Sequence, residues 1–315
     1  MPSAHLYFFS DACPSDWLVD GQDDTWHTIV NVVFQSAPDL QSHVERGVPH
    51  IAVLELDPYF REMIEALKSG LNSGVLRKWK TGPSYHASFC RAFSNIWPKY
   101  QPLVSACSFQ ERALRQSKAA LLNAYNTRIG GLEGRGISFR EYVDRKGRLC
   151  MRHEFVDITG HHEFACPENQ ILVLLFMSWF VADQHAFYVR DIVASGRHGF
   201  DQLTVTVVSD KLSGDDDSRR VSEHCLRWLI DPETDGTPIL LTRSPQSDEF
   251  AGDLLADNLA GWLNDCVSNP SGECWSMARG LEPFGAWSGW HVLAPSSERL
   301  RSVPAVIRLR VTGTV

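Results

Sequence analysis

The sequence lacks a hydrophobic run long enough to cross a membrane. Its longest apolar stretch, residues 171–182, has twelve residues and includes a serine, whereas a membrane-spanning helix needs about 20. The N-terminus has no basic stretch followed by a small-residue cleavage site, so it shows no secretory signal. The eight cysteines are scattered, without the spacing of a disulfide framework. We therefore expect a cytoplasmic protein with reduced thiols and no membrane partner.

Several common catalytic motifs are missing as well. The sequence has no Gly-rich loop ending in Lys-Ser or Lys-Thr and no Gly-x-Gly-x-x-Gly after a strand. It also lacks the Gly-x-Ser-x-Gly turn that carries the nucleophile of α/β-hydrolases. These absences argue against ATP hydrolysis, nicotinamide chemistry and serine hydrolysis.

The sequence has no excess of positive charge. Its 30 lysines and arginines stand against 38 acidic residues, which gives a formal net charge of −8. This balance argues against a surface that binds nucleic acid everywhere, but a local basic groove remains compatible because affinity depends on where the charge lies. With 43% hydrophobic and 22% charged residues the composition is that of a globular protein.

The pattern of residues predicts an α/β fold, because β-branched runs typical of strands occur together with apolar residues at helical spacing. The expected strands lie at residues 6–9, 28–34, 102–108, 203–208, 238–242 and 305–311, with a turn at 22–24. The expected helices lie at residues 58–71, 85–96, 110–125, 167–195, 219–229 and 248–265. Residues 137–158 predict a β-hairpin with a charged tip at 145–148. The 315 residues fit one elaborated domain, with a hairpin insertion at 126–166 and a C-terminal extension at 266–315.

Acidic residues follow two of the expected strands. Each strand is stopped by a Ser-Asp pair, at Asp11 and at Asp210. A third acid, Asp257, lies on the last expected helix, where Asp253, Asp257 and Gly261 share one face. Converging carboxylates are the ligands that Mg²⁺ takes, and a pair of such ions about 4 Å apart serves phosphodiester cleavage.

Each of these acids also has an ordinary structural explanation. An aspartate after a strand commonly forms a turn or caps a helix, and an aspartate on a helix is commonly solvated. The acidic run at residues 215–217 is likewise typical of a solvated loop before a helix. Only the order of strand, later strand and terminal helix gives the three acids a joint meaning.

In this order the sequence resembles the RNase H-like superfamily, and most specifically the bacterial family catalogued as domain of unknown function 3800. Members of that family begin with a strand ending in Asp-Glu-Ser-Gly, carry a later Val-Ile-Asp strand and finish with a Leu-Ala-Asp-x-x-Ala-Gly helix. The matching stretches here are residues 7–11, 207–211 and 255–261. The strand at 239–242 and the segment Trp79-Lys80 also match the family's arrangement.

The resemblance implies an RNase H-like mixed sheet flanked by helices, and a divalent-metal-dependent nuclease that cleaves DNA or RNA. Asp11, Asp210 and Asp257 would ligate Mg²⁺ or Mn²⁺, with Lys80 or Lys211 in contact with phosphate. It also implies a role in a phage-defence or mobile-element locus, and a protein partner could supply target recognition.

One position departs from the family's pattern. The family's first aspartate is followed by glutamate, whereas this sequence has Ala12 and Cys13. Asp16, Glu55 or Glu111 could supply the missing carboxylate. Alternatively, the protein is a catalytically inactive RNase H-like module that binds nucleic acid or assembles with other subunits.

Three basic segments are candidates for binding nucleic acid, because basic residues beside aromatic ones can track phosphates and stack on bases. They are residues 77–80, with Lys78, Trp79 and Lys80; residues 97–100; and the hairpin tip, with Arg145, Lys146 and Arg148. The alternative for each is an ordinary solvated surface segment.

Cysteines and histidines at short spacing suggest a zinc site only superficially. The four residues are Cys150, His153, His162 and Cys166. Cys150 and His153 fall on an expected strand, where positions three apart point to opposite faces. We therefore do not expect zinc here, and take Cys150 as a buried thiol and the histidines as loop residues.

Overall fold

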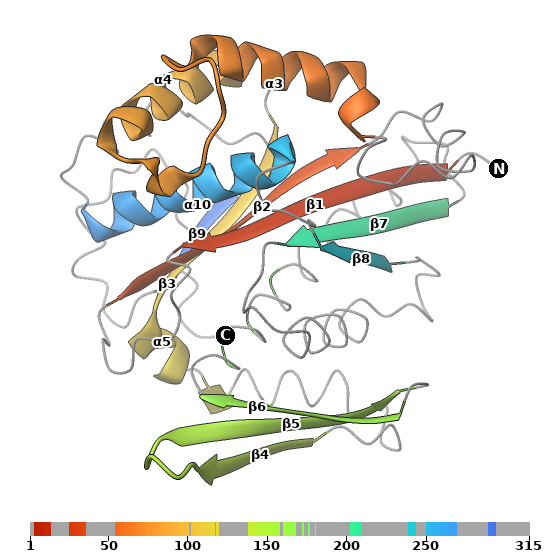
Figure 1. The fold of residues 1–315 in the computed structure, drawn as a ribbon, viewed down its shortest axis with the longest axis vertical. Helices are drawn as coiled ribbons and strands as arrows, with labels where there is room; N and C mark the ends of the chain where they lie inside the picture. The colour runs from red at the N-terminus through yellow and green to blue at the C-terminus, as the bar shows by residue number, and fades with distance from the viewer. Residues whose placement is uncertain are drawn as a thin grey trace.

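The computed structural model describes about half of the chain. The described residues are 3–13, 25–35, 54–100, 102–116, 118–119, 138–157, 160–167, 172, 176, 180, 202–209, 239–243, 250–269 and 289–293. They form a mixed α/β fold with two separate sheets (Figure 1). The turn at 22–24, the helix at 219–229 and the strand at 305–311 that the sequence predicts lie outside these residues.

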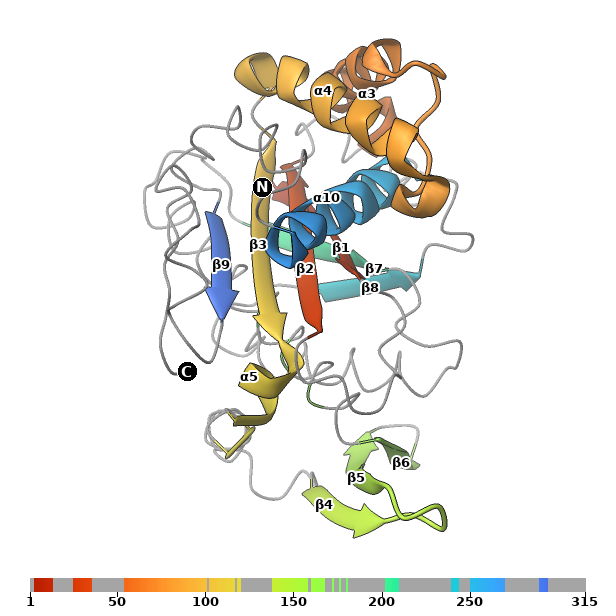
Figure 2. The ribbon, with the colours of Figure 1, turned by 90° about the vertical axis from the view of Figure 1, so that its left-hand side faces the viewer.

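The larger sheet has six strands in the order β8-β7-β1-β2-β3-β9. Their bounds are β1 (Ser3–Cys13), β2 (Trp26–Gln35), β3 (Leu103–Gln110), β7 (Gln202–Ser209), β8 (Ile239–Arg243) and β9 (Gly289–Leu293). Strand β2 is antiparallel to both of its neighbours, and every other pair is parallel. Five strands therefore run in one direction, so that their carboxyl ends meet at one edge (Figure 2).

Most strands of this sheet were predictable. The strands expected at 6–9, 28–34, 102–108, 203–208 and 238–242 are confirmed as β1, β2, β3, β7 and β8. The β-branched residues of β2 and β7 favour extended backbone, since they pack well on a pleated surface. Strand β9 was not predicted; it lies within the expected C-terminal extension and pairs with the edge of β3.

Helix α10 (Ala251–Ser268) lies across β1, β2 and β3 on one face of the sheet, and α3 (Pro58–Gly70) and α4 (Pro83–Tyr100) cover α10 from outside (Figures 1 and 2). Tyr7 and Phe9 project toward α10 because alternate strand residues face the same side. A Cβ atom at Gly252 would come within 2.5 Å of the Phe9 ring, so glycine permits this close packing. Trp262 is fully buried and meets Phe93 edge-on at 6.1 Å.

Tertiary packing extends α4 beyond its expected end. The sequence predicts an end at residue 96, which is wrong, because the helix continues through Pro98 to Tyr100. A proline removes one helical hydrogen bond. Trp97 and Tyr100 are nevertheless buried, and Trp97 packs against Phe93 at 5.6 Å. Burial of these rings holds the last turn together.

The smaller sheet has three antiparallel strands and lies apart from the larger one (Figure 1). Its strands are β4 (Ser138–Val143), β5 (Leu149–Asp157) and β6 (Gly160–Pro167). The predicted hairpin is confirmed by the pairing of β4 with β5. The loop expected around the histidines is wrong, because residues 160–167 form β6, which begins at Gly160 with a φ of 129° that favours glycine.

Two expected helices are described in part. Helix α5 (Glu111–Gln116) begins where the helix at 110–125 was expected. Positions 172, 176 and 180 of the helix expected at 167–195 are helical and buried. Phe176 packs on Phe109 at 5.0 Å, on the face of the sheet away from α10. Among the described helices, none combines the length and apolarity needed to cross a membrane.

Candidate functional site

Asp11 and Asp257 lie on elements that pack together, since β1 carries Asp11 and α10, which covers one face of the sheet, carries Asp257. Asp11 lies near the end of β1, where its Oδ1 accepts a hydrogen bond from the Ala12 amide at 2.7 Å. Two residues on, burial, together with the smaller effects of the charges of Asp265, Asp11 and Asp257, raises the pKa of the Cys13 thiol to about 12. The pKa of the Cys13 thiol is therefore affected by three carboxylates, one from β1 and two from α10.

Residues 255–261 of α10, the stretch that resembles the family motif, contact residues 77–79. Asp257 Oδ2 accepts a hydrogen bond from the Trp79 amide at 2.6 Å, and Asn258 Nδ2 donates one to the Arg77 carbonyl at 2.6 Å. A Cβ atom at Gly261 would overlap the Trp79 ring and lie 2.8 Å from Trp79 Cβ. The stretch that resembles a family motif thus has a clear packing role in addition to its proposed metal role.

Asp265 is a carboxylate of this region that the sequence reasoning missed. Its Oδ2 accepts a hydrogen bond from Trp79 Nε1 at 3.1 Å and lies 3.8 Å from His86 Nδ1. Partial burial raises the pKa of Asp265, against the opposing effects of His86 and Trp79. The available signal was the i, i+4 series, because Asp265 follows Gly261 as Gly261 follows Asp257.

Glu111 lies on the other face of the sheet. Its Oε2 is 3.8 Å from His27 Nε2, and its Oε1 is 3.7 Å from the Arg115 guanidinium. The neighbouring residue Thr28 donates a hydrogen bond to Asn264 of α10 at 3.1 Å, so His27 projects to the opposite side. The structure therefore does not bring Glu111 to Asp11 and Asp257.

Of the other two acids considered for the missing glutamate, Glu55 and Asp16, only Glu55 lies among the described residues. Glu55 is exposed on the surface. Its pKa is raised by partial burial, against the smaller opposing effect of Lys68 of α3. Asp16, Asp210 and Lys211 lie outside the described residues. Ser209, which precedes Asp210, pairs with Ser10, which precedes Asp11. Within the described part of the chain, no three His, Cys, Asp or Glu side chains are close enough to hold a metal ion.

In the first basic segment, residues 77–80, lysine side chains are accessible but the tryptophan side chain is buried. The Trp79 ring is 7% exposed and stacks on the His86 ring with centroids 3.7 Å apart. It is therefore not open to a nucleic-acid base. Lys80 is exposed and Lys78 is partly exposed.

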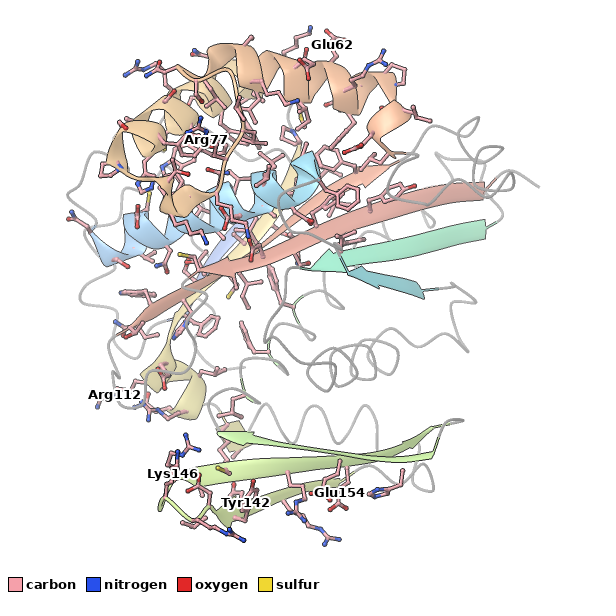
Figure 3. All side chains as sticks on the ribbon, in the orientation of Figure 1. Glu62, Arg77, Arg112, Tyr142, Lys146 and Glu154 are labelled. Atoms are coloured by element: carbon pink, nitrogen blue, oxygen red, sulfur yellow. The ribbon has the colours of Figure 1, made fainter. Side chains whose placement is uncertain are left out.

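The hairpin tip is held by one aspartate within the tip. Asp144 Oδ1 accepts hydrogen bonds from the amides of Lys146 and Arg148, and its Oδ2 accepts one from Arg148 Nε at 2.8 Å. Arg148 is therefore paired, whereas the side chains of Arg145 and Lys146 are exposed. Figure 3 shows Lys146 at the end of the smaller sheet, and Arg77 beside α4 above α10.

The register of the smaller sheet separates the four zinc candidates. Met151 pairs with Cys166, His153 pairs with Phe164 and Phe155 pairs with His162. Directly paired residues share a face, so positions 153, 162 and 166 lie on one face and Cys150 lies on the other. Position 150 therefore does not share a face of the sheet with the other three candidate positions.

Comparisons with known proteins add no family. No family model matches this chain, and neither the curated proteins nor the solved structures gave a match. The functional interpretation therefore rests on the residues and their geometry.

Proposed function

We propose that the protein is a divalent-metal-dependent nuclease with an RNase H-like fold, acting on DNA or RNA. The sheet order supports this, because β1, β2 and β3 form an antiparallel meander with β7 and β8 added in parallel beside β1, as in RNase H-like sheets. The observation that carries the proposal is geometric: Ser10, which precedes Asp11, pairs with Ser209, which precedes Asp210, and α10, which carries Asp257, packs on β1.

The donor set fits a hard cation. Asp11 and Asp257 offer carboxylate oxygens, the ligands that Mg²⁺ and Mn²⁺ prefer. Asp210 is the proposed third ligand, because it follows Ser209, which pairs with Ser10. When bound, the ions would activate a water and stabilise the leaving 3′-oxygen.

The chain's own residues orient this site. The Asp257 carboxylate is fixed by the Trp79 amide, and Asp11 is fixed by the Ala12 amide. Lys80 lies one residue from that anchored amide, where its ammonium group would contact a substrate phosphate; Lys211, next to Asp210, is the other proposed contact. A phage-defence or mobile-element role belongs to the same proposal.

A second candidate is a catalytically inactive module that binds nucleic acid or assembles with other subunits. Two observations favour it. Ala12 stands where the family has glutamate, and Glu111 is engaged with His27 on the wrong face to replace it.

A cleavage assay separates the two candidates. Purified protein is incubated with labelled single-stranded and duplex DNA and RNA, in Mg²⁺, Mn²⁺ or EDTA. We expect cleavage that EDTA and Asp257→Asn each abolish. Asparagine retains an oxygen that can accept from the Trp79 amide, so this variant should fold.

Asp144→Asn is the matched control, because it changes an acid at the hairpin tip and should leave cleavage intact. Cleavage that persists in Asp257→Asn or in EDTA would contradict the metal site. Binding without any cleavage would instead support the inactive module.

A further inference from the structure

The stretch of sequence around Trp79 contains no acidic residue, although Asp257 and Asp265 of α10 contact Trp79. Residues 66–110 contain no aspartate or glutamate, although the chain has 38 acids in total. The same stretch contains the basic residues Lys68, Arg77, Lys78, Lys80, Arg91 and Lys99. This is the kind of local basic surface that a net charge of −8 leaves possible.

Two of these cations are neutralised by acids outside the stretch. Lys68 Nζ lies 2.9 Å from Glu65, and Lys99 Nζ lies 2.6 Å from Glu62. By contrast, Arg77 and Lys80 are exposed, and within the described part of the chain neither side chain has an ion pair. Within the described part of the chain, positive charge therefore remains uncompensated at Arg77 and Lys80.

Backbone contacts hold this segment in one conformation. The Arg77 carbonyl accepts hydrogen bonds from Asn258 and from the Tyr85 hydroxyl at 2.7 Å, and the Arg77 amide donates to the same hydroxyl at 2.8 Å. The Trp79 carbonyl is 2.5 Å from His86 Nε2. The segment is thus ordered before any ligand binds, which lowers the entropic cost of binding.

We propose that Arg77 and Lys80, anchored to α10 through Trp79, form an edge that binds the phosphate backbone of a nucleic-acid strand. The anchor places this edge directly beside Asp257. Because the Trp79 ring is buried, the edge reads charge and not base identity. Trp79 and Asp265 are positioning residues. The proposal deepens and rests on the proposed function, since a nuclease must hold its strand next to the metal ligands.

The experiment measures binding without cleavage. The intact protein is titrated into a fluorescent single strand and a fluorescent duplex, of DNA and of RNA, in EDTA at several salt concentrations. The double variant Arg77→Ala/Lys80→Ala should weaken binding roughly tenfold, and each lost contact should lower the salt slope by about 0.7–0.9. The matched control is Lys68→Ala/Lys99→Ala, which removes two paired lysines of the same stretch and should change neither quantity.

The positioning role has its own readout. Trp79→Phe keeps an aromatic ring against Gly261 but removes the N–H that Asp265 accepts. We expect weaker binding with an unchanged salt slope, because the number of phosphate contacts stays the same. A slope that falls as in the double variant would overturn the positioning role.

Failure of this proposal can be told from failure of the nuclease. Unchanged affinity and slope in Arg77→Ala/Lys80→Ala overturn the edge, even if Asp257→Asn still abolishes cleavage. Loss of binding in that double variant, without cleavage by the wild type, keeps the edge and overturns the nuclease. No binding by the wild type overturns the edge and points to an acidic protein partner for this surface.

Discussion

Two of the basic segments, residues 77–80 and the hairpin tip 144–148, look alike in the sequence but are held in different ways. The first is fastened by α10, whose Asp257 lies 178 positions from Trp79. The second is closed by Asp144, which lies two and four positions from the residues it binds. Long-range hydrogen bonds hold residues 77–80 against α10 and its carboxylates. The hydrogen bonds of the hairpin tip are local and order only the tip itself.

The pKa values of Asp265 and Asp144 are shifted in opposite directions. Partial burial raises the pKa of Asp265, whereas hydrogen bonds from the Arg148 amide and its neighbours lower the pKa of Asp144. The surroundings of Asp265 therefore disfavour its ionised form, whereas those of Asp144 favour it. The difference between the two segments can be tested by substitutions that alter packing, by the pH dependence of stability and by labelling of the Cys13 thiol.

The largest effect should come from filling the contact between α10 and Trp79. Gly261→Ala places a Cβ atom in the indole ring, and overpacking of this kind costs about 1–3 kcal/mol or more. At the tip, Gly147→Ala meets no atom within 4 Å and has only its φ of 76° to oppose it, a cost of about 1–2 kcal/mol. Urea unfolding measures both free energies.

The location of the two losses is the sharper criterion. Gly261→Ala should lower the global free energy of unfolding, since Trp79 packs on α10 in the main core. Gly147→Ala should appear only as faster hydrogen exchange in β4 and β5. An equal global loss in both variants would contradict the distinction between the anchored segment and the local tip.

How far the sequence predicts this molecule depends on whether the deciding contacts are local. β-branched runs and helical spacing correctly predicted five strands of the large sheet and α3, whose bounds follow from the Asp57 cap and Pro58. The end of α4 was missed because burial of Trp97 outweighs Pro98. Strand β6 was missed because it exists by pairing with β5.

The same division applies to the site. That Asp11 lies near the end of a strand and Asp257 on a helix was predictable, since an apolar run stopped by Ser-Asp and helical spacing are local signals. That Glu111 is on the wrong face was not predictable, because the face depends on the register of β3 against β2. The burial of Trp79 was hidden too, because its partners Asp265 and Gly261 come from the other end of the chain.

An intermediate effect should appear when the charge of Asp265 is removed. Its folded pKa is raised, so its contribution to stability is fully present below the unfolded pKa, about 3.9, and is lost as pH rises through the folded pKa. Asp265→Asn should therefore not destabilise the protein at pH 7, because an amide oxygen can still accept from Trp79 Nε1. Asp265→Ala leaves that donor unpaired and should cost about 1–2 kcal/mol.

Urea unfolding at pH 7 and pH 4 provides the measurement. The stability of the wild type relative to Asp265→Asn should improve as the pH falls. A loss in Asp265→Asn as large as that in Asp265→Ala would show instead that the charge itself stabilises the anchor.

A chemical readout of the same carboxylates is the Cys13 thiol. Because burial and the charges of Asp265, Asp11 and Asp257 raise its pKa to about 12, alkylation at pH 8.5 should be slow. A Mg²⁺ ion on Asp11 and Asp257 would lower that pKa, and each unit gives about ten times more thiolate. Labelling should therefore accelerate in Mg²⁺.

Cys107 is the internal control for this labelling. It is fully buried, and burial alone raises its pKa. It also faces away from α10, since it pairs with Ile29. Its labelling should not respond to Mg²⁺, and Asp11→Asn should remove the response of Cys13. A Mg²⁺ response that persists in Asp11→Asn would place the ion elsewhere.

The smallest and most local effect concerns Asp144. Its folded pKa is lowered, mainly by the hydrogen bond from the Arg148 amide, so its contribution is present above the unfolded pKa of about 3.9 and is lost as pH falls through the folded pKa. Asp144→Asn should speed hydrogen exchange in β4 and β5 at pH 7 but make little difference near pH 2. The pH response is opposite in sign to that of Asp265. If Asp144→Asn also weakened the packing of Trp79 on α10, the tip would not be the self-contained unit that its hydrogen bonds indicate.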